Sequence, residues 1–125
     1  MNKQSVNVAV APIHNKPNFN SEMITQCLMW EAVEITTKHN DWFKIETVDG
    51  YYGWIHTFYL SEIDYSCDRF LTVYDRFLPI YSNESLDSEI ISVLSFGTKV
   101  PVLSKNKNGF FELSTSSKYF IYTNF

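Results

Sequence analysis

The sequence repeats itself once, and this internal repeat constrains the fold more than any other feature. Similar residues recur 67 positions later along much of the chain. The matching residues are Pro12-Ile13 and Pro79-Ile80, Ser21-Glu22 and Ser88-Glu89, Ile24 and Ile91, Val33 and Val100, and Ile35 and Val102. A repeat in a chain of 125 residues leaves about 60 residues for each copy, which is near the smallest size of a self-sufficient domain. We therefore predict two tandem copies of one small module, residues 1–63 and 64–125.

A β-hairpin is predicted near the end of the first copy, where Asp49-Gly50 lies between two apolar runs. This dipeptide accepts a positive φ at low cost, so it favours a turn that joins a strand over residues 42–47 to one that begins near Tyr52. Gly53 inside the second strand indicates a β-bulge or a close approach of the backbone. Because side chains alternate along a strand, either Trp54 or the residue after it faces the core.

Short alternating segments predict β-strands elsewhere in the first copy. Residues 6–11 alternate with period two, and Pro12 is expected to end that strand before a long polar loop over residues 14–21. Residues 32–36 predict a further strand, and residues 56–60 predict one 3₁₀ turn before a short last strand. Short strands of this kind, in two copies, predict an all-β fold with two tandem small barrels.

The second copy departs from the first at its most distinctive positions. Lys118 stands where the first copy has the turn glycine, and Ile121 stands where it has Gly53. As aligned, the sequence reaches Phe125 before any counterpart of the last strand of the first copy. Either residues 65–73 fill that sheet edge, or the chain continues in a longer parent protein, because an unpaired edge strand invites pairing with another chain.

Charge and hydropathy argue against two classes of function. The net charge is −4 and the Lys and Arg residues are scattered, so a nucleic-acid binder with a basic stripe is not expected. No window is apolar over the length that spans a bilayer, and residues 1–7 lack the apolar stretch of a signal peptide. We therefore expect no membrane span and a cytoplasmic location, or the cell envelope if this chain belongs to a processed longer protein.

The Cys and His residues do not form a recognisable reactive motif. Cys27 and Cys67 lie far apart without CxxC spacing, and we expect both to be buried free thiols. His14, His39 and His56 lack any HxH or HxxxH spacing that would place two imidazoles on one element. We expect neither a metal site nor a cofactor.

A set of residues in the first copy also carries a family resemblance. These residues are Val8-Ala9-Val10, Pro12, Ser21-Glu22, Gln26, Glu31, Val33, Asp41-Trp42, and Asp49-Gly50-Tyr51 followed by Gly53-Trp54-Ile55. With this pattern, residues 6–63 resemble the bacterial SH3-like domains that precede the catalytic domain of NlpC-type cell-wall cysteine peptidases. The hairpin group is the most specific part. The second copy is similar to the second SH3-like domain of those enzymes only in the order of its elements.

The resemblance implies a role for the hairpin tyrosine. In the relatives that hydrolyse γ-D-glutamyl-diamino acid bonds in peptidoglycan stem peptides, the first SH3-like domain narrows the substrate cleft. The tyrosine at the position of Tyr51 helps there to hold the free N-terminal L-alanine end of the peptide. A phenol beside a tight turn is rigid and exposes its hydroxyl, which suits such a contact. We predict Tyr51, Tyr52 and Trp54 as ligand-binding residues; the other interpretation of Tyr51 is a half-buried turn aromatic.

The nucleophile motif of those peptidases is not found in this sequence. They use a Cys in an Asp-Cys-Ser context and a later His as base, because the thiolate is held by an imidazole within reach. Cys67 lies in Ser-Cys-Asp, and no His follows it. We therefore expect no catalytic residues here and a non-catalytic region of a peptidoglycan cysteine peptidase. Its expected partners are stem peptides and a peptidase catalytic domain.

A second functional class stays open, a free-standing SH3-like module that binds cell-wall or protein peptides. Tyr59, in the predicted 3₁₀ turn, would serve an aromatic groove for proline-rich peptides like that of eukaryotic SH3 domains. The Ala-Leu-Tyr-Asp-Tyr signature of those domains is absent, and Glu22 is the one acid at the long loop.

Overall fold

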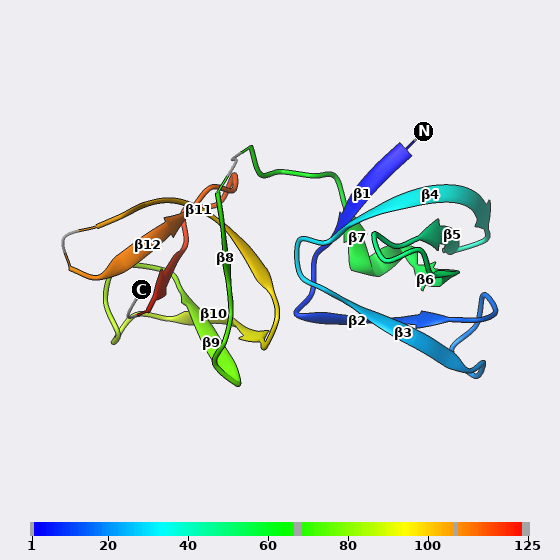
Figure 1. Ribbon diagram of the computed structural model, residues 1–125, viewed down its shortest axis with the longest axis horizontal. Coiled ribbons are helices and arrows are strands. Elements are labelled where there is room, and N and C mark those ends of the chain that lie inside the picture. Colours follow the sequence, from blue (N-terminus) through cyan, green and yellow to red (C-terminus); the bar gives the residue numbers. More distant parts are fainter. Residues whose placement is uncertain (1, 67–68, 107, 124–125) are drawn as a thin grey trace. The chain divides into compact units, whose positions relative to one another are not determined.

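The structure is a computed structural model that describes residues 2–66, 69–106 and 108–123. The chain divides into two compact units, Met1–Ile63 and Asp64–Phe125, and each holds its own sheet (Figure 1). Within the described residues, one 3₁₀ helix is the only regular element that is not a β-strand. This confirms the prediction of an all-β chain. No helix in these ranges has the length and apolar character needed to cross a bilayer.

The described residues of the first unit form a seven-stranded antiparallel sheet in the order β3-β2-β6-β5-β4-β1-β7. Its elements are β1 (Asn2–Val6), β2 (Val10–His14), β3 (Met23–Leu28), β4 (Ala32–His39), β5 (Trp42–Glu46), β6 (Tyr52–His56), the 3₁₀ helix η1 (Thr57–Tyr59) and β7 (Leu60–Ser61). The 3₁₀ turn and the short strand after it were both predicted from the sequence.

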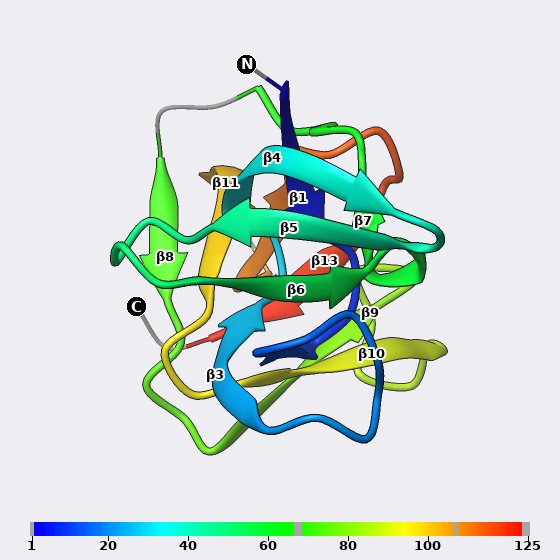
Figure 2. The same cartoon turned by 90° about the vertical axis from the view of Figure 1, so that its right-hand side faces the viewer.

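Strands β4, β5 and β6 follow one another in sequence and lie side by side in the sheet (Figure 2). One face of these strands is apolar and buried, with Val33, Ile45 and Ile55 each at most 1% exposed. They pack in one core with residues of the other strands, namely Val6, Ala11, Ile13, Cys27 and Leu60. The residue of β6 that faces the core is therefore Ile55 and not Trp54.

The predicted strand over residues 6–11 is wrong, because the chain turns within it. Val6 ends β1, and β2 begins at Val10. The turn is held by Asn7, whose backbone N–H donates to Tyr59 O at 3.0 Å. Its side-chain amide donates to Phe58 O at 3.2 Å and to Ser61 Oγ at 2.8 Å. Period-two alternation continues on both sides of this turn, so the pattern alone did not reveal it.

Pro12 does not end strand pairing, contrary to the prediction, and lies inside β2. It is opposite Gln26 of β3. On the other side, β2 meets β6 only where His14 is opposite Trp54. The edge of β2 toward β6 is thus unpaired along most of its length, and a strand with an open edge accepts a residue that lacks an N–H.

The described residues of the second unit form a six-stranded sheet in the order β10-β9-β13-β12-β11-β8. Its strands are β8 (Phe70–Thr72), β9 (Phe77–Tyr81), β10 (Ile90–Ser95), β11 (Lys99–Lys105), β12 (Phe110–Leu113) and β13 (Phe120–Tyr122). The order repeats that of β3, β2, β6, β5, β4 and β1. The two halves of the sequence therefore share one strand arrangement, as the repeat predicts.

The described part of residues 65–73 contains β8, which is the first strand of the second unit and not its last. In the first unit β1 pairs with β4, placing Ser5 opposite Ala32; in the second unit β8 pairs with β11, placing Thr72 opposite Lys99. Both pairs differ by the same 67 positions as the sequence repeat. Within the described residues, the second sheet has no counterpart of β7, and β8 lies at its edge.

The second unit compensates for its missing strand glycine by packing. Ile121, at the position of Gly53, is 1% exposed and belongs to the buried face of β13. The loop before β13 is also wider than the first hairpin, since Leu113 N–H donates to Tyr119 O at 2.9 Å. The position of Lys118 therefore lies in an open loop, which needs no positive φ.

Candidate functional site

The predicted hairpin is present at residues 47–51. The Gly50 N–H donates to Thr47 O at 3.0 Å, and the Thr47 N–H donates to Tyr51 O at 2.8 Å. Gly50 has a φ of +88°, which glycine adopts without the steric cost of a Cβ atom. The loop has three residues rather than two, a form in which a type I turn is followed by a left-handed residue. The Asp-Gly signal identified the turn but not its length.

The side chain of Thr47 fixes the residue after the turn. Thr47 is mostly buried, and its Oγ1 accepts a hydrogen bond from the Tyr51 N–H at 3.0 Å. Together with the backbone bond from Thr47, this holds the Tyr51 peptide at two points. Tyr51 itself is 51% exposed. The structure thus presents this phenol on a short, braced hairpin.

Gly53 marks a close approach of the backbone and not a bulge. Pairing between β5 and β6 is regular here, with Ile45 opposite Gly53. A Cβ on Gly53 would lie 2.6 Å from Ile13 Cγ2 and 2.9 Å from the backbone oxygen of His14. The glycine is therefore required by the packing of β6 against β2.

The three predicted ligand-binding residues do not share one face. Tyr52 and Trp54 alternate with the buried Gly53 and Ile55, so they point to the outer side of β6. Tyr51 precedes the strand and has the opposite parity. Tyr52 is 57% exposed, and Trp54 is partly buried. Tyr51 and Tyr52 are accessible to a ligand from different sides of the hairpin.

Tyr52 and Trp54 have local partners on the sheet. Tyr52 is opposite Glu46, whose negative charge raises the pKa of the Tyr52 phenol above its ordinary value; a side-chain hydrogen bond to Glu46 acts in the same direction. Trp54 is opposite Lys44, and its ring meets the ring of His39 edge-on at 6.3 Å. Tyr52 therefore stays protonated and able to donate.

An aromatic cluster lies at the other end of β6 and was not predicted as a unit. We define it as His14, Phe19, Trp42 and His56. The ring of Phe19 lies 4.7 Å from that of Trp42 and stacks on that of His56 at 5.4 Å. Trp42 is also edge-on to His56 at 5.3 Å and to His14 at 5.7 Å. Trp42 and His14 are each only 7% exposed, so they form the buried side of the cluster.

Phe19 gives the aromatic cluster its exposed side. It is 56% exposed and comes from the long loop after β2, which is otherwise polar. The loop is fixed to the cluster by His14, whose Nδ1 lies 3.0 Å from Ser21 O. Tyr59 in η1 extends the surface, with its ring 6.3 Å from that of His56. A lone phenylalanine in a polar loop was the available sequence signal.

Cys27 is a buried, free thiol, as predicted. Burial raises the pKa of this thiol from 9.0 to about 12, and the carboxylate of Glu31 adds to the shift. A thiol in this state is a poor nucleophile at neutral pH. Cys67 lies outside the described residues. Within the described ranges, no three His, Cys, Asp or Glu side chains gather as metal ligands would.

A known protein family matches most of the first unit. Residues 13–58 match the family described as the bacterial dipeptidyl-peptidase Sh3 domain. The matched segment begins in β2, ends in η1, and contains both the hairpin and the whole aromatic cluster. The predicted resemblance of the first copy is thereby confirmed. No curated protein matches the chain in sequence.

Two solved structures are similar to the chain. An NlpC/P60 family protein from Bacillus cereus ATCC 10987 superposes with a TM-score of 0.78 at 16% identity, covering 98% of this chain and 54% of that one. NlpC2 from Trichomonas vaginalis has a TM-score of 0.41 at 18% identity, covering 95% of this chain and 45% of that one. The present chain thus spans about half the length of these proteins. At this identity, the first similarity shows a shared fold.

Proposed function

Starting from a first unit that is a bacterial SH3-like domain, we propose that this chain is the non-catalytic region of a peptidoglycan cysteine peptidase. In this role it binds or positions cell-wall stem peptides for a catalytic domain that cleaves γ-D-glutamyl-diamino acid bonds. The observation that carries the proposal is the family match over residues 13–58. The fold shared with an NlpC/P60 family protein over 98% of the chain supports it.

The hairpin supports a contact with the end of a short peptide. Tyr51 is exposed, and its backbone is held by Thr47 through two hydrogen bonds. An aromatic side chain on such a support loses little conformational entropy when a ligand binds. The phenol offers both a donor and an acceptor, so it suits the free N-terminal end of a stem peptide.

The chemistry of bond cleavage is assigned to a different domain. Cys27 is fully buried and its pKa is raised to about 12, so it does not supply a thiolate near neutral pH. The three histidines lie at the ends of β2, β4 and β6. The proposal therefore gives this chain a role in substrate placement alone.

The test is an NMR titration of the ¹⁵N-labelled chain with the tripeptide L-Ala-γ-D-Glu-diaminopimelate. We expect saturable amide shifts around Tyr51 and Trp54, which Tyr51→Ala abolishes. Tyr51→Phe separates the hydroxyl from the ring. The matched control is Phe58→Ala, because Phe58 is an exposed aromatic residue in η1, at the opposite end of β6 from Tyr51. This variant should leave the shifts unchanged. Hydrolysis of the tripeptide by the chain that disappears in Cys27→Ala or in Cys67→Ala would overturn the non-catalytic role.

A second candidate function is peptide binding at the aromatic cluster. Phe19 is exposed against the buried Trp42, and the half-buried Tyr59 lies next to His56, an arrangement that resembles a groove for an extended proline-rich peptide. Titration with a peptide containing a Pro-x-x-Pro motif tests this function. Saturable shifts at Phe19 that are lost in Phe19→Ala and kept in Tyr51→Ala would favour it over the first proposal.

A further inference from the structure

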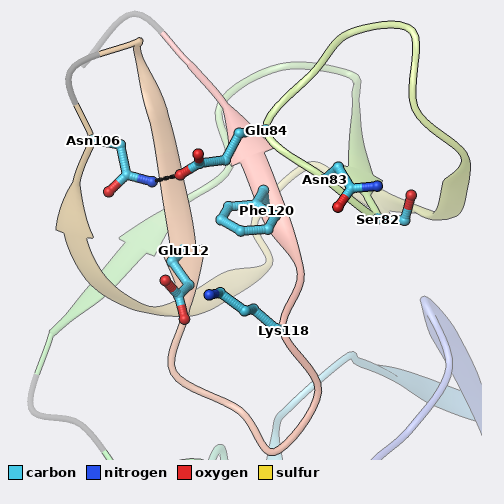
Figure 3. Close-up of a pocket in the computed structure, with 7 residues that line it drawn as sticks. All are labelled: Ser82, Asn83, Glu84, Asn106, Glu112, Lys118 and Phe120. Carbon is cyan, nitrogen blue, oxygen red and sulfur yellow. Dashed lines mark hydrogen bonds between the residues drawn. The ribbon is translucent and has the colours of Figure 1, made fainter.

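The second unit has an open polar pocket that the proposed function does not use. Its volume is about 380 Å³, which is near the lower end of the range for small-molecule sites. Seven residues line it: Ser82, Asn83, Glu84, Asn106, Glu112, Lys118 and Phe120 (Figure 3). They come from β12 and β13 and from loops that flank β9, β11 and β13.

The floor of the pocket is part of the sheet. Phe120 is opposite Glu112 on β12 and opposite Tyr81 on β9. Directly opposed residues point to the same side of a sheet, so Glu112 and Phe120 project together, away from the buried Phe111 and Ile121. Phe120 is only 4% exposed. The pocket therefore has a fixed aromatic base with a carboxylate beside it.

One wall is built from two loops that are bonded to each other. The Asn106 side-chain amide donates to Glu84 Oε1 (Figure 3). The loop that carries Glu84 is closed by Ser88, whose Oγ donates to Ser85 O at 2.6 Å and accepts from Asn83 N–H at 3.3 Å. The carboxylate of Glu84 is thus held in place, with its second oxygen still available.

Charges of both signs meet in this pocket. Glu84 and Glu112 supply two carboxylates, and Lys118 supplies one ammonium group. In the view of Figure 3, the side chains of Glu112 and Lys118 point toward each other across the pocket, and the ring of Phe120 lies between Glu84 and Lys118. Lys118 is exposed and Glu112 is half-buried. A ligand that carries one positive and one negative group would match this arrangement.

These charges are not inherited from the repeat. The positions that correspond to Glu112, Lys118 and Glu84 in the first copy are Lys44, Gly50 and Pro17. The first unit therefore has a lysine at the position of Glu112 and uncharged residues at the positions of Lys118 and Glu84. This set of charges is therefore specific to the second copy, and one of them, Lys118, stands where the first copy has the turn glycine.

We propose that this pocket binds a small zwitterion with an amino-acid backbone, either a free amino acid or a dipeptide. Its ammonium group lies against the carboxylates of Glu84 and Glu112, and its carboxylate group pairs with Lys118. Its apolar part rests on Phe120. Charge-assisted hydrogen bonds of this kind are stronger than neutral ones, so they give a shallow pocket its selectivity. The pocket belongs to the second unit, and the proposal does not depend on the proposed function of the first unit.

The test is an NMR titration of the full chain with L-alanyl-L-alanine, its N-acetyl form and its C-terminal amide. We expect saturable shifts at the amides of Asn83, Asn106, Glu112 and Phe120 with the unmodified dipeptide, and at least tenfold weaker binding of the two blocked forms. Free L-alanine distinguishes the two sources: binding as tight as that of the dipeptide identifies an amino-acid site, and weaker binding a dipeptide site.

Variants of the charged residues complete the test. Glu112→Gln and Lys118→Met should each weaken binding at least tenfold while the other amide signals keep their positions. Lys44→Met, at the position of Glu112 in the first unit, should leave binding unchanged. Equal binding of the blocked and unmodified dipeptides, no saturation up to about 50 mM, or undiminished binding in Lys118→Met would overturn the proposal.

Discussion

Replacing Gly53 with alanine probes the packing of the first unit most sharply. An alanine Cβ would lie 2.6 Å from Ile13 Cγ2, 2.7 Å from Ile24 Cδ1 and 2.9 Å from His14 O. Ile24 is 40% exposed, so its side chain is free to turn away. Ile13 is fully buried, and His14 O belongs to the backbone. The overlap is therefore relieved only by moving β2 away from β6.

Two opposing contributions set the size of the effect. Inserting a methyl group into a well-packed site costs about 1–3 kcal/mol. Alanine in place of glycine returns about 0.5–1 kcal/mol, because the unfolded chain loses less conformational freedom on folding. With the Ile13 and His14 overlaps both below 3.0 Å, the first contribution dominates. We expect Gly53→Ala to lower the free energy of unfolding by about 1–2 kcal/mol, or the Tm by about 5–10 °C.

Urea denaturation followed by tryptophan fluorescence measures this change in the first unit alone, because Trp30, Trp42 and Trp54 all belong to it. The control is the same substitution in an Ile24→Ala background. There, Gly53→Ala should cost as much stability as it does in the wild type, because the exposed Ile24 side chain does not cause the overlap. A Gly53→Ala protein as stable as the wild type would refute the close approach of β6 to β2.

Three further changes test the core, the hairpin and the aromatic cluster. Because the pKa of Cys27 rises from 9.0 to about 12 on folding, the folded protein keeps a proton that the unfolded chain loses. The quantity to follow is the free energy of unfolding of the wild type minus that of Cys27→Ala. This difference should fall by about 1.4 kcal/mol per pH unit above pH 9, and a difference that does not change with pH would contradict the raised pKa. Thr47→Val removes the acceptor of the Tyr51 N–H and should cost about 1 kcal/mol in urea denaturation, whereas Thr47→Ser should cost less; equal losses would exclude the hydrogen bond as the cause. Phe19→Ala removes the ring that packs on Trp42 and should cost about 1 kcal/mol with a change in tryptophan emission, and unchanged emission would place the ring elsewhere.

The parts of the fold that were predictable rest on local chemistry. Asp49-Gly50 predicted the hairpin because few residues other than glycine accept the φ of +88° that Gly50 has in the turn. Gly53 was recognised as unusual because a strand interior rarely tolerates glycine without a packing reason. The repeat at 67 positions predicted a shared strand order, since equal patterns of buried residues select equal pairings.

The errors arose where tertiary contacts override a local pattern. Residues 6–11 alternate without interruption, but Asn7 hydrogen-bonds to residues 58, 59 and 61, which are more than fifty positions away. Pro12 was expected to stop the strand. It lies within β2 because most of the edge of β2 toward β6 is unpaired, so the missing N–H of proline costs no hydrogen bond there. Neither the hydrogen bonds of Asn7 nor the unpaired edge of β2 can be predicted from the neighbouring residues in the sequence.

The candidate site was predictable only in part for the same reason. Tyr51 was predicted as a site residue from the turn beside it, and the structure shows that Thr47 holds its backbone. The aromatic cluster combines residues from β2, β5, β6 and a loop, and only the fold brings Phe19 against Trp42. In the second unit, Glu84 and Glu112 share a pocket although 28 positions separate them in the sequence.

The proposed function requires that the Tyr51 end of the first unit contacts the free N-terminus of a stem peptide. The most direct measurement compares the shift of the Tyr51 amide during titration with L-Ala-γ-D-Glu-diaminopimelate and with its N-acetylated form. We expect a saturable shift with the free peptide and at least tenfold weaker binding after acetylation, because the blocked amine no longer offers a charged donor to the phenol oxygen. Equal binding of the two peptides, or no shift at Tyr51 with either, would contradict it.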